Sequence, residues 1–182
     1  MALQLSQKET TLLKDQETHE KVCIEKYQKY AAQASDPQLK QLFQSFAQQE
    51  QQHLNTITSI MNGQVPSMNQ SQQQGQQSAQ SQSQSQTTSQ SQSQATSQSQ
   101  SGQTATMTAQ PATAASANTA DAMLCKDMLM TEKYVSNAYD TAIFEFTDSN
   151  VRQALNHIQK EEQKHGEGIF NYLNSKGMYN VQ

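Results

Sequence analysis

The chain has 182 residues, a formal net charge of −4 and a hydrophobic fraction of only 34%. Its acidic and basic residues are interspersed, so no basic patch indicates nucleic acid and no basic amphipathic face indicates an anionic membrane. No apolar run is long enough for membrane insertion and the N-terminus lacks a signal-peptide pattern, so we expect synthesis in the cytoplasm.

The first part of the chain predicts a helical hairpin. The capping-box sequence Ser6-Gln7-Lys8-Glu9 places a helix start just after its serine, and the helix continues to about Ala34. Asp36-Pro37 combines an N-cap with a proline at the first helical position, and Asn62-Gly63 closes this second helix. Because only a tight turn separates the helices, we expect them to pack antiparallel as one unit, residues 6–62.

A low-complexity tract follows, and after it a second hairpin. Residues 63–120 are mostly Gln, Ser, Thr, Ala and Asn without a periodic apolar face, which predicts a disordered linker. A third helix is expected to begin around Asn118 to Asp121. Asp148 is a predicted N-cap for a fourth helix that ends near Ser175, so the second hairpin occupies residues 121–176.

The two hairpins are copies of each other in sequence. A shift of 112 residues aligns them without a gap, and a set of identical residues coincides. The matched pairs include Leu12 and Leu124, Asp15 and Asp127, Tyr27 and Tyr139, Asp36 and Asp148, Ile57 and Ile169, and Asn62 and Asn174. Such a repeat predicts two helical hairpins of one design that bury their apolar faces against each other as an all-α, antiparallel four-helix bundle.

Each half contains one Glu-x-x-His motif, from Glu50 to His53 and from Glu162 to His165. Residues three apart share one face of a helix, and both motifs interrupt an apolar stripe of helical period. A carboxylate and an imidazole at core-facing positions are costly unless another group satisfies them. A bound metal ion would do so.

The spacing places a further glutamate beside each motif. Glu20 lies fifteen residues before the first turn and Glu50 fourteen residues after it, so each is about 22 Å from that turn at a rise of 1.5 Å per residue. Glu132 and Glu162 have the same relation to the second turn. Packing the hairpins therefore predicts a single group at one level of the bundle, called here the Glu/His cluster: Glu20, Glu50, His53, Glu132, Glu162 and His165.

Four carboxylates and two imidazoles in a core need compensating cations, and two divalent ions would balance their charge. The same ligand types occur in di-iron and di-manganese carboxylate bundles. By this analogy Glu50 and Glu162 bridge two metal ions, and the other four residues are terminal ligands. Oxygen and imidazole ligands suit iron or manganese without deciding between them. The alternative is a metal-free polar network or a vestigial site kept as a scaffold.

Tyr27 and Tyr139 lie seven residues after the glutamates of the first and third helices, and therefore point toward the level of the cluster. Their hydroxyl groups have three readings: hydrogen-bond donors to ligand carboxylates, participants in radical chemistry, or satisfied groups of ordinary core tyrosines.

The second half resembles the coat F family of bacterial spore coat proteins. The resemblance rests on Thr131-Glu132-Lys133-Tyr134-Val135-Ser136, on the segment from Tyr139 to Glu145, on the segment from Leu155 to Gly166, and on the terminal Gly177-Met178-Tyr179. It covers about sixty residues. The first half resembles the wider ferritin-like superfamily, and it agrees with coat F proteins in its residue pattern more than in its exact sequence.

The resemblance implies a ferritin-like bundle that is made in the mother-cell cytoplasm of a sporulating bacterium and assembled into the spore coat. Its expected partners are other spore coat proteins, and association with further copies of the chain is left open. The resemblance implies no particular reaction or catalytic residue. The alternative function is a di-manganese or di-iron redox enzyme acting on peroxide or oxygen, because manganese catalases and rubrerythrins share this ligand set. In ferritin-like bundles the second and third helices are parallel and need a crossover about one bundle length long, and the length of the Ser/Gln tract departs from this because it far exceeds that need. The tract is either a tolerated loop expanded by repeat slippage or a sticky, crosslinkable coat segment.

Overall fold

The computed structural model describes residues 3–64 and 112–179, with side chains in the second range described from residue 118 onward. Within these ranges the chain is all-helical and contains no strand, as the sequence predicts. None of the helices in these ranges has the length and apolarity that a membrane crossing requires. The four helices are α1 (Gln7–Gln33), α2 (Pro37–Met61), α4 (Ala112–Glu145) and α5 (Ser149–Ser175).

Three helix starts are fixed by the caps that the sequence predicts. The Ser6 side chain accepts a hydrogen bond from the Glu9 backbone N–H, and the Glu9 carboxylate accepts one in return from the Ser6 backbone N–H. Asp36 caps α2 and Asp148 caps α5 through the same kind of side-chain acceptor. These contacts satisfy N–H groups that have no partner inside the helix, so the predicted starts of α1, α2 and α5 are confirmed.

The start of α4 differs from the prediction. The sequence places this helix start around Asn118 to Asp121, whereas α4 begins at Ala112. Four of residues 112–117 are alanine, the residue with the highest helix propensity, so the helix can extend without an apolar stripe or an N-cap signal. The last part of the predicted linker is therefore helical. The disorder predicted for the Ser/Gln tract falls mainly on residues 65–111, which lie outside the described residues.

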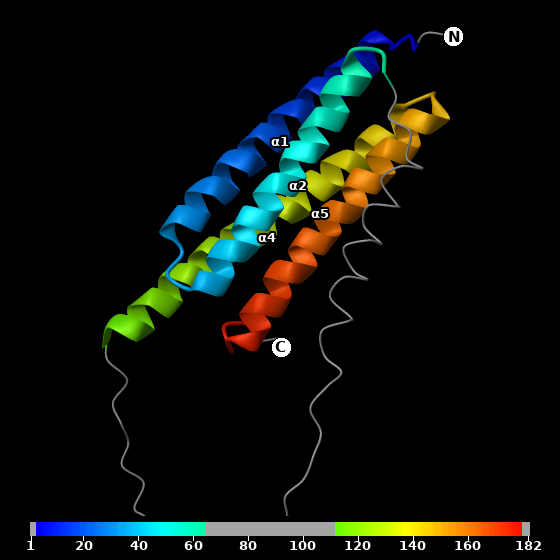
Figure 1. The fold of residues 1–182 in the computed structure, drawn as a ribbon. Coiled ribbons are helices and arrows are strands. Elements are labelled where there is room, and N and C mark those ends of the chain that lie inside the picture. Colours follow the sequence, from blue (N-terminus) through cyan, green and yellow to red (C-terminus); the bar gives the residue numbers. More distant parts are fainter. Residues whose placement is uncertain (1–2, 65–111, 180–182) are drawn as a thin grey trace, which may run out of the picture.

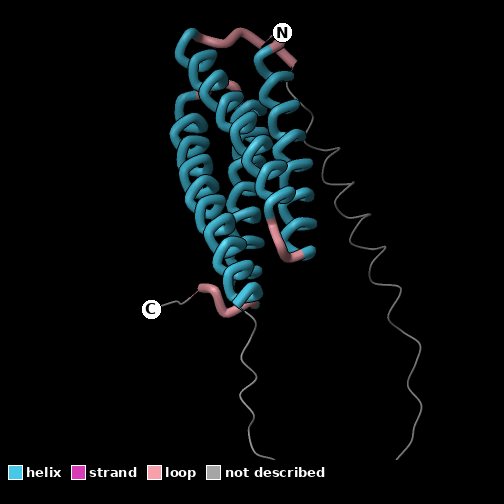
Figure 2. Tube along the Cα trace, turned by 90° about the vertical axis from the view of Figure 1, so that its left-hand side faces the viewer, coloured by secondary structure: helices cyan, strands magenta, loops and turns pink. Residues whose placement is uncertain are grey.

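The helices lie side by side as a bundle (Figures 1 and 2). α1 packs on α2 and α4 packs on α5, and the two hairpins meet through α1 against α4 and α2 against α5. Helices joined by a tight turn run antiparallel, whereas α2 and α4 run in the same direction (Figure 1). The end of α2 and the start of α4 therefore lie at opposite ends of the bundle (Figure 1).

The apolar core is divided into two clusters along the bundle. One cluster contains Leu13, Cys23, Ile57, Ile60, Val135, Tyr139, Ala142, Phe146, Val151, Ala154, Leu155 and Ile158. The other contains Tyr27, Ala31, Ala34, Leu39, Phe43, Phe46, Ala47, Cys125, Met128, Ile169, Tyr172 and Leu173. On α2, α4 and α5 the members of the Glu/His cluster fall between these two sets in sequence, and on α1 Glu20 precedes Cys23, the last residue of the first set on that helix. The apolar core therefore holds a polar layer between its ends.

Each hairpin turn is tied to the other hairpin by a buried acidic side chain. Glu9 of α1 accepts hydrogen bonds from the backbone N–H of Thr147 at 2.9 Å and from its hydroxyl at 3.1 Å. Asp121 of α4 accepts from the backbone N–H groups of Ser35 and Asp36, both at 2.9 Å. Glu9 and Asp121 are 112 residues apart, so the two ties occupy equivalent places in the two halves.

We expect Glu9→Ala to destabilise the bundle by about 1–3 kcal/mol, because it removes the glutamate half of the capping box and leaves the donors of Ser6 and Thr147 without their acceptor. Burial opposes ionisation of Glu9, but its hydrogen bonds from Thr147 and Ser6 prevail and lower its pKa from 4.5 to about 2. The stabilisation is therefore fully present above pH 4.5 and is lost as the pH falls toward 2. Denaturant unfolding at several pH values measures both effects.

The matched control is Glu17→Ala, which removes an exposed i, i+4 pair with Lys21 on the same helix and should change stability by less than about 0.5 kcal/mol. Equal free energies of unfolding for Glu9→Ala and Glu17→Ala would contradict the role assigned to Glu9.

Candidate metal centre

The structure brings the six predicted residues together. α1 contributes Glu20, α2 contributes Glu50 and His53, α4 contributes Glu132, and α5 contributes Glu162 and His165. Each of these residues is at most 2% exposed. The prediction that these residues lie at one level of the bundle, which was based on their distance in sequence from the turns, therefore agrees with the structure. All four helices contribute side chains to this level.

The Glu/His cluster forms two overlapping groups of four residues. One group joins Glu20 and His53, the other joins Glu132 and His165, and Glu50 and Glu162 belong to both. Within each group, one potential ligand atom per residue lies within 4.8 Å of all the others. This is the spacing that side chains around a single ion require, so the geometry suits two ions that share two carboxylates.

Both imidazoles present the same ring nitrogen to the carboxylates. Nδ1 of His53 lies 2.9 Å from Glu162 Oε1 and 3.3 Å from Glu50 Oε2. Nδ1 of His165 lies 3.0 Å from Glu50 Oε1 and 3.6 Å from Glu162 Oε2. Each of these two glutamates thus offers one oxygen atom to each histidine, which is the arrangement of a bridging carboxylate.

Burial and like charges favour neutral forms for two of the carboxyl groups. Removal from water raises the pKa of Glu20 and of Glu132 well above its ordinary value, and the neighbouring Glu50 and Glu162 add to the shift. Each of the two neutral groups lies on a different hairpin and belongs to only one group of four. The direction of both shifts favours the protonated form when no metal ion is bound, and a cation could replace these protons.

The pKa shifts of the shared carboxylates and of the imidazoles favour the charged forms instead. Burial opposes ionisation of Glu50 and Glu162, but the adjacent imidazoles of His165 and His53 lower the pKa of both. Burial also opposes a charge on the imidazoles, yet their hydrogen bonds to carboxylates raise the pKa of His53 well above its ordinary value and that of His165 to about 11. Two imidazolium groups therefore compensate two carboxylates when no metal ion is bound.

This compensation is incomplete. Four buried side-chain oxygen atoms form no hydrogen bond of good geometry: Oε2 of Glu20, Oε2 of Glu132 and both oxygens of Glu162. The Glu162 oxygens nevertheless lie 2.9 and 3.6 Å from imidazole nitrogens, so their contacts are ionic. All the buried side-chain oxygens and nitrogens in the described residues that lack such a hydrogen bond belong to the cluster. An unpaired buried carboxylate oxygen costs free energy, and coordination by a cation would remove that cost. The donor set, the spacing and the unpaired oxygens all fit a pair of divalent metal ions.

Two tyrosines connect the hairpins at the level of the cluster. Tyr27 of α1 donates a hydrogen bond to Glu132 Oε1, and Tyr139 of α4 donates one to Glu20 Oε1. Both rings are fully buried. Of the three readings that the sequence left open, the geometry favours the first, in which each tyrosine hydroxyl holds a carboxylate in place.

Two residues outside the Glu/His cluster, which the sequence did not single out, contact its imidazoles. Nε2 of His53 lies 2.9 Å from a carboxylate oxygen of Glu161, and Nε2 of His165 lies 2.6 Å from the amide oxygen of Gln49. Gln49 and Glu161 precede the motif glutamates and are separated by 112 residues, so the repeat register was a signal that could have found them. An acceptor at Nε2 fixes the ring and leaves Nδ1 free to bind a metal ion.

Comparison with known proteins concerns the second half of the chain. Residues 120–182 match the family model of the Coat F domain, which confirms the resemblance for this segment. No curated protein and no solved structure matches the chain. The matched segment includes α5 and most of α4, and with them three members of the Glu/His cluster: Glu132, Glu162 and His165.

Proposed function

Because residues 120–182 are a Coat F domain, we propose that the protein is a structural component of the bacterial spore coat. In this proposal it is made in the mother-cell cytoplasm, incorporated into the coat and surrounded there by other coat proteins. The family match is the observation that carries the proposal. No particular reaction forms part of it.

We further propose that the bundle is ferritin-like and built from two repeated hairpins. Several contacts support this, because each has a counterpart 112 residues away in the other half. They are the turn ties of Glu9 and Asp121, the tyrosine contacts of Tyr27 and Tyr139, and the histidine contacts of Gln49 and Glu161. Contacts exchanged in this reciprocal way are expected when two copies of one hairpin design pack against each other.

The Glu/His cluster is proposed to hold two iron or manganese ions. Glu50 and Glu162 would bridge them, Glu20 and His53 would complete one site, and Glu132 and His165 the other. The observation that carries this part is the set of four unpaired oxygen atoms. Such ions would supply redox and Lewis-acid chemistry. The chain's own residues bury the site, and Tyr27 and Tyr139 orient its terminal carboxylates.

Elemental analysis tests the metal proposal. Protein produced in medium supplemented with iron or with manganese should contain two equivalents of one of these metals after gel filtration. Absence of metal under every supplementation would overturn this part of the proposal while leaving the coat assignment intact. Consumption of peroxide by the loaded protein would favour a redox enzyme instead.

Fractionation of spores tests the coat proposal. The protein should be extracted with the coat layers, and Glu162→Ala should reach them in the same amount because assembly does not need the metal ions. Recovery of the parent protein only from the spore core would contradict a structural role in the coat. Failure of Glu162→Ala alone to assemble would show that the site is needed for incorporation.

The contacts at Nε2 give a separate prediction. Glu161→Ala should lower the affinity for the ion bound by Glu20 and His53 by roughly 10–100-fold, because a hydrogen-bonded partner orients a ligating imidazole and raises its basicity. The ion beside His165, whose partner is the neutral amide of Gln49, should be affected much less. Competition with a chromophoric chelator measures the two affinities.

Lys160→Ala provides the matched control, since Lys160 is an exposed neighbour of Glu161 on α5. It should leave both affinities at the parent values. Equal affinities in Glu161→Ala and Lys160→Ala would contradict a role for the carboxylate in metal binding.

A further inference from the structure

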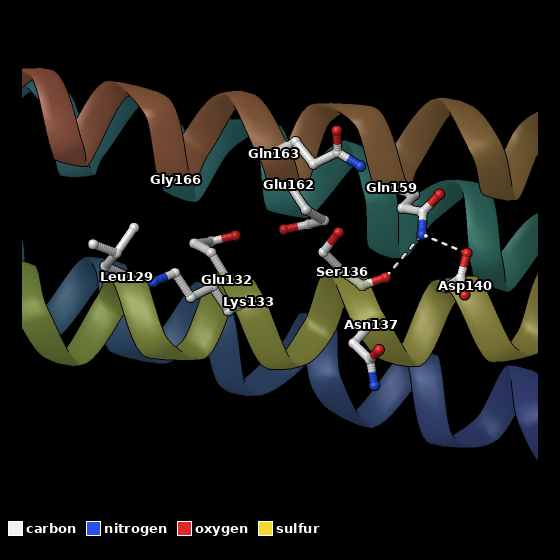
Figure 3. A pocket seen from close by; sticks show the side chains of 10 residues that line it. All are labelled: Leu129, Glu132, Lys133, Ser136, Asn137, Asp140, Gln159, Glu162, Gln163 and Gly166. Atoms are coloured by element: carbon white, nitrogen blue, oxygen red, sulfur yellow. Dashed lines mark hydrogen bonds between the residues drawn. The ribbon is translucent and has the colours of Figure 1, made fainter.

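A groove with a volume of about 460 Å³ lies between α4 and α5, beside the Glu/His cluster (Figure 3). The buried Glu132 and Glu162 form its inner side, and their side chains point into the space between the two helices (Figure 3). Asp140 and Gln159 lie at one end of the groove (Figure 3), where the Gln159 amide donates hydrogen bonds to the Ser136 backbone carbonyl at 3.0 Å and to Asp140 at 3.5 Å. The groove thus leads from exposed polar side chains to two members of the cluster.

The inner side contains most of the buried oxygen atoms that lack a hydrogen bond in the described part of the chain. Three of the four belong to the groove-lining Glu132 and Glu162, and these side chains are 2% and 0% exposed. They are the first carboxylates of the cluster that an ion in the groove would meet. The exposed Lys133 and Asp140 carry opposite charges at the rim, so the preference for cations comes from the inner carboxylates.

Small residues on the two helices border the groove. Gly166 of α5 and Ser136 of α4 line it next to the glutamates. The equivalent residues of the first hairpin, 112 positions earlier, are Leu54 and Ile24, which are both half-buried and much larger. The two halves therefore differ in side-chain volume at the level of the cluster, and the smaller residues are on the hairpin that has the groove.

We propose that divalent metal ions enter and leave the Glu/His cluster through this groove between α4 and α5. The inference rests on the proposed metal function and concerns the path by which ions reach it. An ion meets Glu132 and Glu162 first, and Glu162 then presents it to both groups of four. Side chains that fill the groove should slow entry and exit equally, because they obstruct the path without changing a ligand.

The test uses Co²⁺ as the probe, with its absorbance reporting uptake and a chromophoric chelator reporting release. In Gly166→Leu and in Ser136→Ile, which copy the first hairpin, both rates should fall about tenfold, corresponding to about 1.4 kcal/mol in the barrier. The amount bound at equilibrium should stay at the parent value. Circular dichroism verifies that each variant is helical, and Ser136→Ile decides the outcome if Gly166→Leu does not fold.

Gly166→Ala is the matched control. A Cβ atom at this position would lie 3.6 Å from Leu129 Cδ1 and 3.9 Å from Glu132 Cβ, which are ordinary contacts, so alanine fits and leaves the groove open. Its rates should equal those of the parent. If the folded Gly166→Leu and Ser136→Ile variants take up and release Co²⁺ at the rates of the parent, the proposed path is wrong, although the metal site itself is unaffected by that result. Absence of Co²⁺ binding to the parent, together with absence of iron and manganese, would overturn both.

Discussion

Replacing Glu50 by alanine should remove both metal ions together. Glu50 Oε1 lies 3.0 Å from Nδ1 of His165 and its Oε2 lies 3.3 Å from Nδ1 of His53, so one side chain serves both groups of four. Its loss also leaves the two imidazoles with only one of their two shared carboxylates, Glu162. The metal content should fall from two equivalents to near zero, which elemental analysis of gel-filtered protein measures.

Glu20→Ala supplies the comparison, because Glu20 belongs to only one group of four. This variant should lose the ion beside His53 and keep much of the other. Both variants should remain helical, since each removes a buried acid without disturbing a cap or an apolar cluster. Retention of one full equivalent by Glu50→Ala would show that this glutamate does not bridge the ions.

Loading the metal-free protein with its two ions should raise its melting temperature by more than about 10 °C. An ion at a free concentration 100 times its Kd stabilises the folded state by about 2.7 kcal/mol, so two ions that are each at this concentration give roughly 5 kcal/mol. For a folded region of this size, each kcal/mol moves the melting temperature by roughly 3–6 °C. The physical source is the neutralisation of carboxylates that are buried and partly unpaired without the ions.

Thermal unfolding followed by circular dichroism, with and without metal, measures this difference. Glu50→Ala serves as its control, because a variant that binds no ions should show no response to added metal. An equal rise in the parent and in Glu50→Ala would assign the effect to general binding of ions at the surface. No rise in the parent would contradict a role of the ions in stability.

Most helix boundaries followed from short-range chemistry. Ser6, Asp36 and Asp148 are caps that act within three residues of the helix start, so the local sequence contains all the required information. The predicted start of α4 was wrong, because an alanine-rich sequence has high helix propensity but contains no signal that marks the boundary of the helix. The turn ties were missed for a different reason: Glu9 reads as an ordinary capping-box glutamate, while its second oxygen reaches Thr147 in the other hairpin.

The members of the Glu/His cluster could be predicted because their positions depend on simple helix geometry. Equal distances from a tight turn place two residues of a hairpin at the same depth, and the repeat places the second pair beside the first. The partners at Nε2 could not be derived in the same way. Gln49 and Glu161 are polar residues in Gln- and Glu-rich surroundings, and only the direction of each imidazole ring singles them out.

The sequence by itself determined the all-helical composition, two hairpins in one register, and the identity and depth of the six buried acid and imidazole groups. These features depend on caps, turns and helical rise, which act along the chain. The tertiary structure alone decided which atoms face one another: the sharing of Glu50 and Glu162 between the imidazoles, the four unpaired oxygens, and the groove beside Ser136 and Gly166. The reason is that these contacts join side chains from different helices, whose rotation and separation follow from the packing of the whole core.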